Sequence, residues 1–237
     1  MRYGFIPLIF MALCGGCGSG GTVPAKAAGG GFEPSQLAKT DIDRVAEAHQ
    51  REIFSSLRLL AEKLYRRNPR EWRRGGQPSL DAAVARIFDR AHGWQFAELE
   101  GRRATDAIQL AFREDFRGDR VLALIAGLGG MVQAAFRDKV AFFALDDLDP
   151  QALSNAARNV EIAVWKLSVA THLGDGELFL RSNEAAGAVR NLSFEREFGK
   201  IIGSLDLLAG IVADKTNRTV VKVIQNLATA LFLPVKF

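Results

Sequence analysis

The stretch VLALIAGLGGMVQAAF, from Val121 to Phe136, decides the fold of this chain, because its only polar side chain is Gln133. Two interpretations are open, a membrane-spanning helix or a central helix surrounded by other helices. A membrane-spanning helix needs about 20 apolar residues. This stretch is shorter, and charged residues close it on both sides: Asp119, Arg120, Arg137 and Asp138. We therefore expect a helix that is buried on all sides within a helical domain.

Glycines within this stretch predict close helix packing. Each glycine destabilises a helix by about 1 kcal/mol relative to alanine, so its presence suggests that another backbone must approach. Three glycines lie here, Gly127, Gly129 and Gly130, and three more share one face of a later helical segment: Gly199, Gly203 and Gly210. The pattern predicts that these two helices pack against each other through their glycine faces.

Helix signals surround the apolar stretch on both sides. Thr40 with Asp43, then Ser79, Asp119 and Asp149 followed by Pro150, mark helix starts. Together with apolar periodicity they predict helices over residues 40–68, 79–93, 104–116, 120–136, 150–171, 193–213 and 219–231. The short run ELFLR, residues 177–181, is the only strand candidate. The fold class is therefore predicted to be all-α, a single bundle of about seven helices.

The beginning of the chain has the features of a bacterial lipoprotein signal. A short apolar segment ends in Leu13-Cys14-Gly15-Gly16-Cys17, and these are the only two cysteines in the chain. It is too short to span a membrane and is typical of a cleaved secretory signal. We expect residues 1–16 to be removed and Cys17 to carry a diacylglycerol anchor. Lipidation at Cys14, a redox Cys-x-x-Cys pair and a metal site are the alternatives.

The expected anchor determines the domain organisation and the localisation. Residues 17–35 are glycine-rich and predict a flexible tether, and residues 36–237 predict the helical domain. Such a protein faces the periplasm, and Gly18 after the anchor cysteine favours the outer membrane by analogy with enteric lipoproteins. The net charge of +4 is small and does not indicate a nucleic-acid partner.

A basic segment follows the first predicted helix. The sequence YRRNPREWRRGG, residues 65–76, combines arginines with a tyrosine and a tryptophan around Pro69. One interpretation is a solvated loop. The other is a polyanion contact with phospholipid or lipopolysaccharide head groups, made by Arg66, Arg67, Arg70, Trp72, Arg73 and Arg74.

Two polar segments predict a buried network. Asn155 and Asn159 are poor helix formers one turn apart, so we expect hydrogen-bond partners for both. The segment SNAARNVEIAVWK, residues 154–166, is expected to face RNLSFEREFGK, residues 190–200. The candidate network is Asn155, Arg158, Asn159, Glu161, Glu195 and Glu197, structural in one interpretation and catalytic in the other.

Sequence motifs for chemistry are otherwise missing. The three histidines, His49, His92 and His172, lie at unrelated positions and predict no metal site. We find no nucleophile elbow, phosphate loop or dinucleotide fingerprint, and therefore expect no cofactor and no assignable catalytic residue.

Several motifs together resemble a family of uncharacterised proteobacterial lipoproteins. They are the Cys17 signal, KTDIDRVAE, KLYRRNPREW, LDPQALSNAARNVEIAVWKL and NLSFEREFGKIIG. The resemblance implies a lipoprotein and brings no activity. We therefore expect a lipid-anchored periplasmic helical protein with a binding or structural role in the cell envelope. The alternatives are a hydrolase-like envelope enzyme using the region of Arg158 and Glu195, and a carrier of a hydrophobic ligand.

Overall fold

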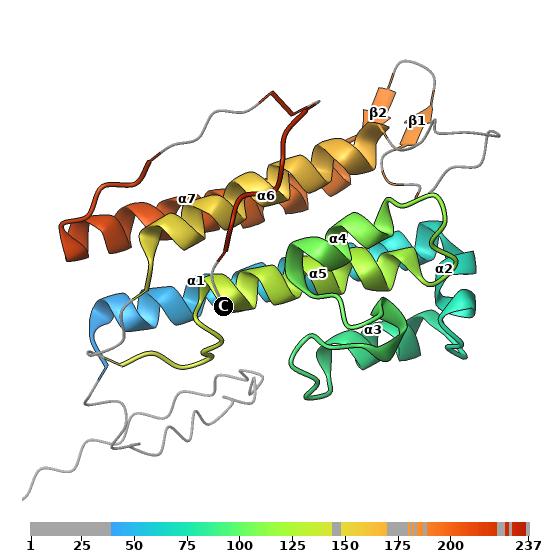
Figure 1. Ribbon diagram of the computed structural model, residues 1–237, viewed down its shortest axis with the longest axis horizontal. Coiled ribbons are helices and arrows are strands. Elements are labelled where there is room, and N and C mark those ends of the chain that lie inside the picture. Colours follow the sequence, from blue (N-terminus) through green and yellow to red (C-terminus); the bar gives the residue numbers. More distant parts are fainter. Residues whose placement is uncertain are drawn as a thin grey trace, which may run out of the picture.

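The computed structural model describes residues 39–143, 148–169, 180, 182, 184–186, 189–221, 226–227 and 229–235. Within these residues the fold is all-α, as predicted, with one small hairpin (Figure 1). The helices are α1 (Asp41–Arg67), α2 (Pro69–Arg74), α3 (Leu80–Phe88), α4 (Ala104–Ala111), α5 (Arg120–Ala135), α6 (Pro150–Val169) and α7 (Ser193–Thr216). A 3-10 helix (Ala97–Leu99) precedes α4, and β1 (Glu184–Ala186) pairs antiparallel with β2 (Val189–Asn191).

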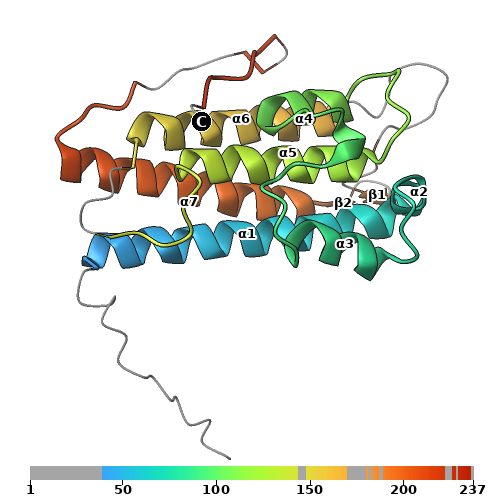
Figure 2. The same cartoon turned by 60° about the horizontal axis from the view of Figure 1, so that its bottom comes forward.

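The four long helices form an up-down-up-down bundle. The helix α1 packs against α5 and α7, and α6 packs against the same two helices, so that neighbours in the ring run antiparallel (Figures 1 and 2). The helix α4 covers the outer side of α5, α3 lies beside α1, and α2 closes one end of the bundle. The bundle interior is filled by side chains such as Leu57, Leu60, Leu124 and Leu205.

The start of α1 follows from its capping residues. The Thr40 side chain accepts from the Asp43 N–H, and an Asp43 carboxylate oxygen accepts from the Thr40 N–H at 2.7 Å. The helix ends at Arg67 because Pro69 disfavours a helical Asn68, whose side chain donates to the Leu64 carbonyl at 2.8 Å. Its buried apolar stripe runs from Ile53 to Leu64, whereas Val45 near the start of the helix is exposed.

The helix α5 is buried on all sides, as predicted from its composition. Asp119 caps it by accepting from the Leu122 N–H at 2.9 Å, and 15 of its 16 residues are buried. Among the described helices, none is long and apolar enough to span a membrane.

The predicted pairing of glycine faces is wrong, because α5 and α7 lie diagonally across the bundle. A Cβ at Gly199, Gly203 or Gly210 of α7 would meet nothing within 4 Å. A Cβ at Gly127 would instead lie 2.7 Å from the Ile108 backbone nitrogen and 2.8 Å from the Ala104 carbonyl oxygen. The close approach is therefore between α5 and α4.

Two helices end earlier than predicted because side chains bind their last carbonyls. The helix α3 ends at Phe88 rather than near Gly93, with His92 Nε2 2.7 Å from the Ile87 carbonyl oxygen, and Ala91 is exposed. The helix α4 ends at Ala111 rather than Phe116. There the Arg120 guanidinium donates to the carbonyls of Ala111 at 2.8 Å and Arg113 at 2.7 Å.

The helix predicted over residues 219–231 is wrong where the structure describes this segment. Residues 218–221, 226–227 and 229–235 belong to no helix or strand, and they run back along the bundle over α6 (Figure 1). The basic segment supplies the seventh helix instead, as α2. The ELFLR candidate lies outside the described residues except for Leu180, and the hairpin β1–β2 was not predicted.

Candidate functional site

A cleft of about 450 Å³ opens between α1, α3 and α5, at their junction with the loop that follows α3. Helix α1 contributes Gln50, Arg51 and Phe54, and α5 contributes Gln133. The remaining lining residues are Ile87, Phe88, Arg90, Ala91, His92, Gly93, Trp94 and Val140. The floor and walls are therefore mostly apolar or aromatic, which is typical of sites for small organic ligands.

Trp94 forms one wall of the cleft in a strained backbone conformation. Its φ is 59°, in the left-handed region that a bulky residue rarely adopts, at a cost of about 1–3 kcal/mol. Its N–H donates to His92 Nδ1 at 2.9 Å, so the neutral His92 ring carries its proton on Nε2 and donates to the Ile87 carbonyl. The turn that carries Trp94 is thereby attached to the end of α3.

Aromatic contacts hold the Trp94 ring in place. It stacks on Phe54, with ring centroids 5.5 Å apart and an interplanar angle of 15°, and meets the edge of Phe88 at 6.1 Å. Such pairs contribute about 0.5–1.5 kcal/mol each beyond the burial of their area. The ring is consequently a fixed surface rather than a mobile side chain.

Two glycines of α5 make room for this ring. A Cβ at Gly129 would lie 2.7 Å from Trp94 Cε3 and closer still to two further ring carbons. A Cβ at Gly130 would lie 3.1 Å from Trp94 Cβ. The glycines that sequence analysis assigned to helix–helix packing therefore also seat the tryptophan of the cleft. The glycines in the sequence indicated that another group approaches α5 closely, but they did not indicate that this group is Trp94.

The polar groups of the cleft are cationic or neutral. Arg51 and Arg90 lie exposed at its rim, and no aspartate or glutamate is among the described residues that line it. Gln50 and Gln133 donate to the Lys139 carbonyl at 2.6 and 2.9 Å, which fixes the backbone next to Val140 at the mouth. The cleft thus combines an aromatic wall with a positive rim.

A second polar cluster, Tyr65, Glu71, Asp119 and Arg120, joins three helices at the opposite end of α1. The Tyr65 hydroxyl donates to Asp119 Oδ2 at 2.8 Å, and the Arg120 N–H donates to Glu71 Oε2 at 2.8 Å. Burial raises the pKa of Asp119 to about 6 and also raises the pKa of Tyr65. Because each of these groups is engaged in hydrogen bonds between helices, the cluster has a structural role.

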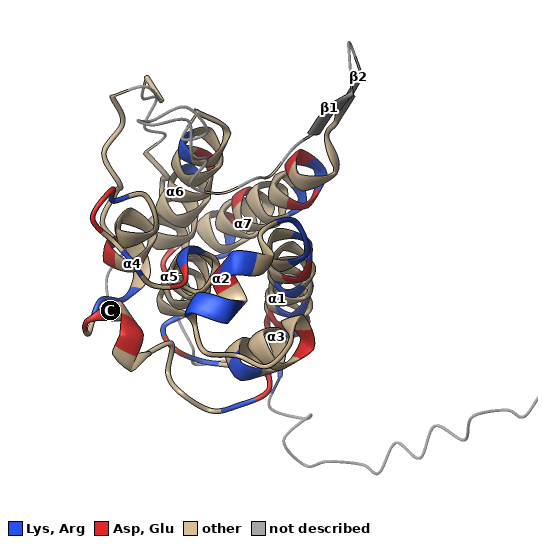
Figure 3. Ribbon diagram, turned by 90° about the vertical axis from the view of Figure 1, so that its right-hand side faces the viewer, with Lys and Arg blue, Asp and Glu red and all other residues tan. Residues whose placement is uncertain are grey.

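The arginines of the predicted polyanion contact gather at this same end of the bundle. Figure 3 shows α2 presenting basic residues beside the end of α1. Arg70 and Arg74 lie 3.0 and 3.3 Å from Glu71 Oε1, whose carboxylate is fully buried. The Arg73 guanidinium lies 4.9 Å from the Trp72 ring, which is half-buried against the core. Arg66 is exposed and Arg67 half-buried in the last turn of α1. The segment is helical, not the loop we expected, because Pro69 is compatible with the first turn of a helix.

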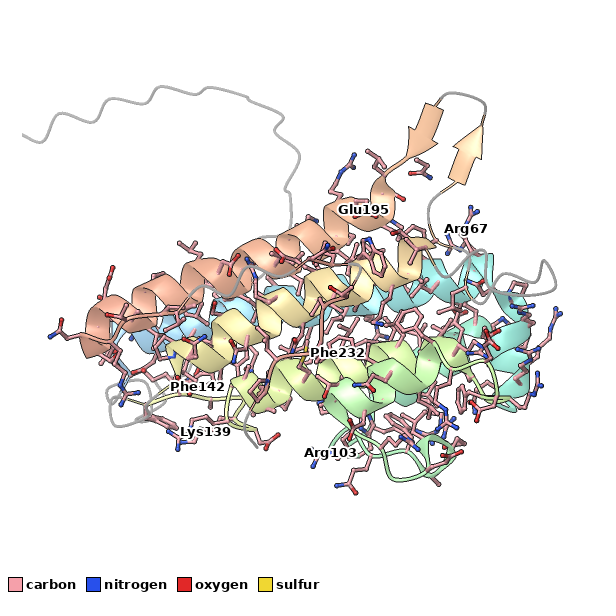
Figure 4. The ribbon with its side chains drawn as sticks, turned by 45° about the horizontal axis from the view of Figure 1, so that its top comes forward. Arg67, Arg103, Lys139, Phe142, Glu195 and Phe232 are labelled. Atoms are coloured by element: carbon pink, nitrogen blue, oxygen red, sulfur yellow. The ribbon has the colours of Figure 1, made fainter. Side chains whose placement is uncertain are left out.

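The six residues of the predicted polar network do not meet at one site in the described contacts. Arg158 lies 3.1 Å from Glu161 and 2.6 Å from Asp206, which joins α6 to α7. Glu197 accepts from Ser56 at 3.3 Å and lies 3.1 Å from Lys200, and Glu195 lies in the first turn of α7 (Figure 4).

The expected partners of Asn155 and Asn159 exist, but they belong to the backbone of the segment after α7. Asn155 donates to the Pro234 carbonyl at 2.9 Å and Asn159 to the Leu233 carbonyl at 2.8 Å. Both amides therefore have the hydrogen-bond partners that their positions predict, but these partners lie after α7 and not in residues 190–200.

No group of three or more His, Cys, Asp or Glu residues is placed to hold a metal ion in the part of the chain that the structure describes. His49 is half-buried on α1, and His172 and Cys17 lie outside the described residues.

Comparison with known proteins finds no match to this chain among family models, curated proteins or solved structures.

Proposed function

We propose that this chain is a lipid-anchored helical protein of the bacterial envelope that binds a small amphipathic anion in the cleft around Trp94. The observation that carries the proposal is the construction of the cleft. A strained tryptophan is seated on two glycines and stacked on Phe54, and both aromatic residues line a cavity of about 450 Å³. Strain of this kind persists where the surroundings enforce it, and it clusters at functional sites.

The charge around the cleft specifies the chemical class of the ligand. Arg51 and Arg90 lie at the rim, and the cleft residues that the structure describes include no carboxylate. The carboxylate nearest to the rim in the described contacts is Glu47, which lies 4.0 Å from the Arg51 guanidinium outside the lining. An apolar or aromatic body packed on Phe54 and Trp94 places a carboxylate, sulfonate or phosphate within reach of these arginines. The hollow lies at the side of the bundle, which distinguishes this proposal from a carrier with a cavity in the bundle interior.

The localisation in this proposal rests on the signal that ends at Cys17. A diacylglycerol anchor there, followed by a glycine-rich tether, attaches the domain to the periplasmic face of the envelope, in the outer membrane by the analogy with Gly18. The helix α1 is 27 residues long, so the arginines at its end lie about 40 Å from the point where the tether enters the bundle. We include a contact between this basic end and anionic phospholipid or lipopolysaccharide head groups in the proposal.

A matched pair of fluorescent probes tests the ligand class. The compound 8-anilino-1-naphthalenesulfonate has the required aromatic body and anionic group, and N-phenyl-1-naphthylamine has the same body without the sulfonate. We expect the sulfonate probe to bind more tightly than the neutral probe and to quench the tryptophan fluorescence of the chain. Phe54→Ala should lower the affinity for both probes, because it removes an aromatic ring that both would contact.

Charge variants distinguish anion binding by the rim arginines from a general effect of positive surface charge. The double variant Arg51→Gln, Arg90→Gln should lower the affinity for the anionic probe by about fivefold, since each exposed charge contributes little. Its affinity for the neutral probe should stay within about twofold of the wild-type value. Arg44→Gln, two turns earlier on α1, is the matched control and should change neither affinity. Equal losses for the two probes in the double variant would contradict an anion-binding rim.

A further inference from the structure

One face of α6 carries three amide side chains spaced one turn apart, Gln151, Asn155 and Asn159, which we call the amide row. Asn159 donates to the Leu233 carbonyl at 2.8 Å and accepts from the Leu233 N–H at 2.6 Å. Gln151 makes the same pair of contacts with Val221, at 3.1 and 2.8 Å. Asn155 donates to the Pro234 carbonyl and accepts from Gln151, both at 2.9 Å.

This geometry recognises a peptide by its backbone. A side-chain amide can hydrogen-bond both the N–H and the carbonyl of one residue, and it then makes the two bonds that a neighbouring β-strand would otherwise make. Side chains of the bound segment contribute as well, and Leu233 itself is half-buried. Val235 is buried, and Phe232 packs against the core beside α6 (Figure 4). Leu231 is 79% exposed, and Pro234 is exposed as well.

The site requires an occupant, and residues 229–235 supply it without belonging to a helix or strand. Asn159 is 0% exposed, so both of its amide atoms depend on the backbone that covers them. The covering segment, residues 229–235, belongs to no helix or strand, and its departure breaks no element of the bundle.

We propose that the amide row is a binding site for an extended peptide with apolar side chains three residues apart. Residues 229–235 of this chain occupy the Asn155 and Asn159 positions of the site, beside Val221 on Gln151, until such a segment of a partner protein displaces them. The proposal is independent of the cleft, because the amide row shares no residue with the cleft lining.

The test uses the full chain with its own segment weakened. Leu233→Pro removes the backbone N–H that donates a hydrogen bond to Asn159, and it leaves the sequence of α6 unchanged. The probe is a fluorescein-labelled peptide TALFLPV, the sequence of residues 229–235, and binding is measured by anisotropy. We expect L233P to bind it at least about tenfold more tightly than the wild type, in which the tethered segment competes at a millimolar effective concentration.

Two controls make the result specific to the amide row. The peptide TALFPPV lacks the same N–H and should not bind L233P. Adding Asn159→Leu to L233P should abolish binding of TALFLPV while circular dichroism shows an intact helical fold. Absent binding to L233P, equal binding of the two peptides, or unchanged binding after N159L would each overturn the proposal. Wild-type binding as tight as that of L233P would show that residues 229–235 do not occupy the site.

Discussion

Replacing glycine by alanine at three helical positions should give opposite effects on stability, although the substitution is the same. In open helix surface, alanine stabilises a helix by about 1 kcal/mol relative to glycine. Gly203 of α7 meets this condition, because a Cβ there has no atom within 4 Å. We therefore expect Gly203→Ala to raise the free energy of unfolding by about 1 kcal/mol.

The glycines of α5 should respond in the opposite direction. Overpacking a close contact costs typically about 1–3 kcal/mol, which meets or exceeds the gain in helix propensity. At Gly127 the new Cβ would lie 2.7 Å from a backbone nitrogen and 2.8 Å from a carbonyl oxygen of α4, and neither atom can rotate away. We expect Gly127→Ala to lower the free energy of unfolding by about 2 kcal/mol.

Replacing Gly129 by alanine should affect both the stability of the fold and probe binding in the cleft. Its new Cβ would overlap the Trp94 ring, which is displaced more easily than backbone, so we expect a loss of about 1 kcal/mol. Displacing the ring also breaks its stacking on Phe54, and probe affinity should fall in Gly129→Ala but not in Gly203→Ala.

Urea unfolding followed by circular dichroism measures the stability of all three variants. If Gly127→Ala and Gly129→Ala stabilise the chain as much as Gly203→Ala, α5 is not packed closely against α4 and Trp94, and the reasoning fails.

Three further predictions concern the buried aspartate, the anchor and the basic end. Burial raises the pKa of Asp119 from 3.8 to about 6, so the folded state binds the proton more tightly than the unfolded state does. The proton therefore contributes on the order of 3 kcal/mol to the free energy of unfolding at low pH, and this contribution should be lost as pH rises from about 4 to 6. Asp119→Asn should remove this pH dependence in urea titrations. Fatty-acid labelling should mark the wild type and not Cys17→Ser, and the protein should sediment with outer membranes on a sucrose gradient. A chain starting at residue 36 should bind anionic vesicles more than neutral ones and release them as salt rises. Glutamine at Arg66, Arg67 and Arg73 should remove that preference, and equal binding to both vesicle types would contradict the contact.

The sequence by itself determined the elements that depend on local chemistry. The capping box of Thr40, the caps at Ser79 and Asp119, and the stop before Pro69 act within a few residues, so they can be recognised in one dimension. The uniform apolarity of α5 likewise indicated a helix surrounded by others. These signals sufficed for the all-α class and for the positions of the long helices.

Only the tertiary structure decided which surfaces meet. The glycines of α5 signalled a close approach, but a small residue does not name its partner, and the bundle places α4 and Trp94 there while α7 lies diagonally opposite. The amides of α6 signalled a need for hydrogen bonds in the same way, and residues 70 positions or more away supply them. The last predicted helix failed for the same reason. Its apolar spacing suits a helix, but Gln151 binds the backbone of Val221 near its start, and Asn155 and Asn159 bind the backbone just after its end. Partners so distant in sequence leave no local trace.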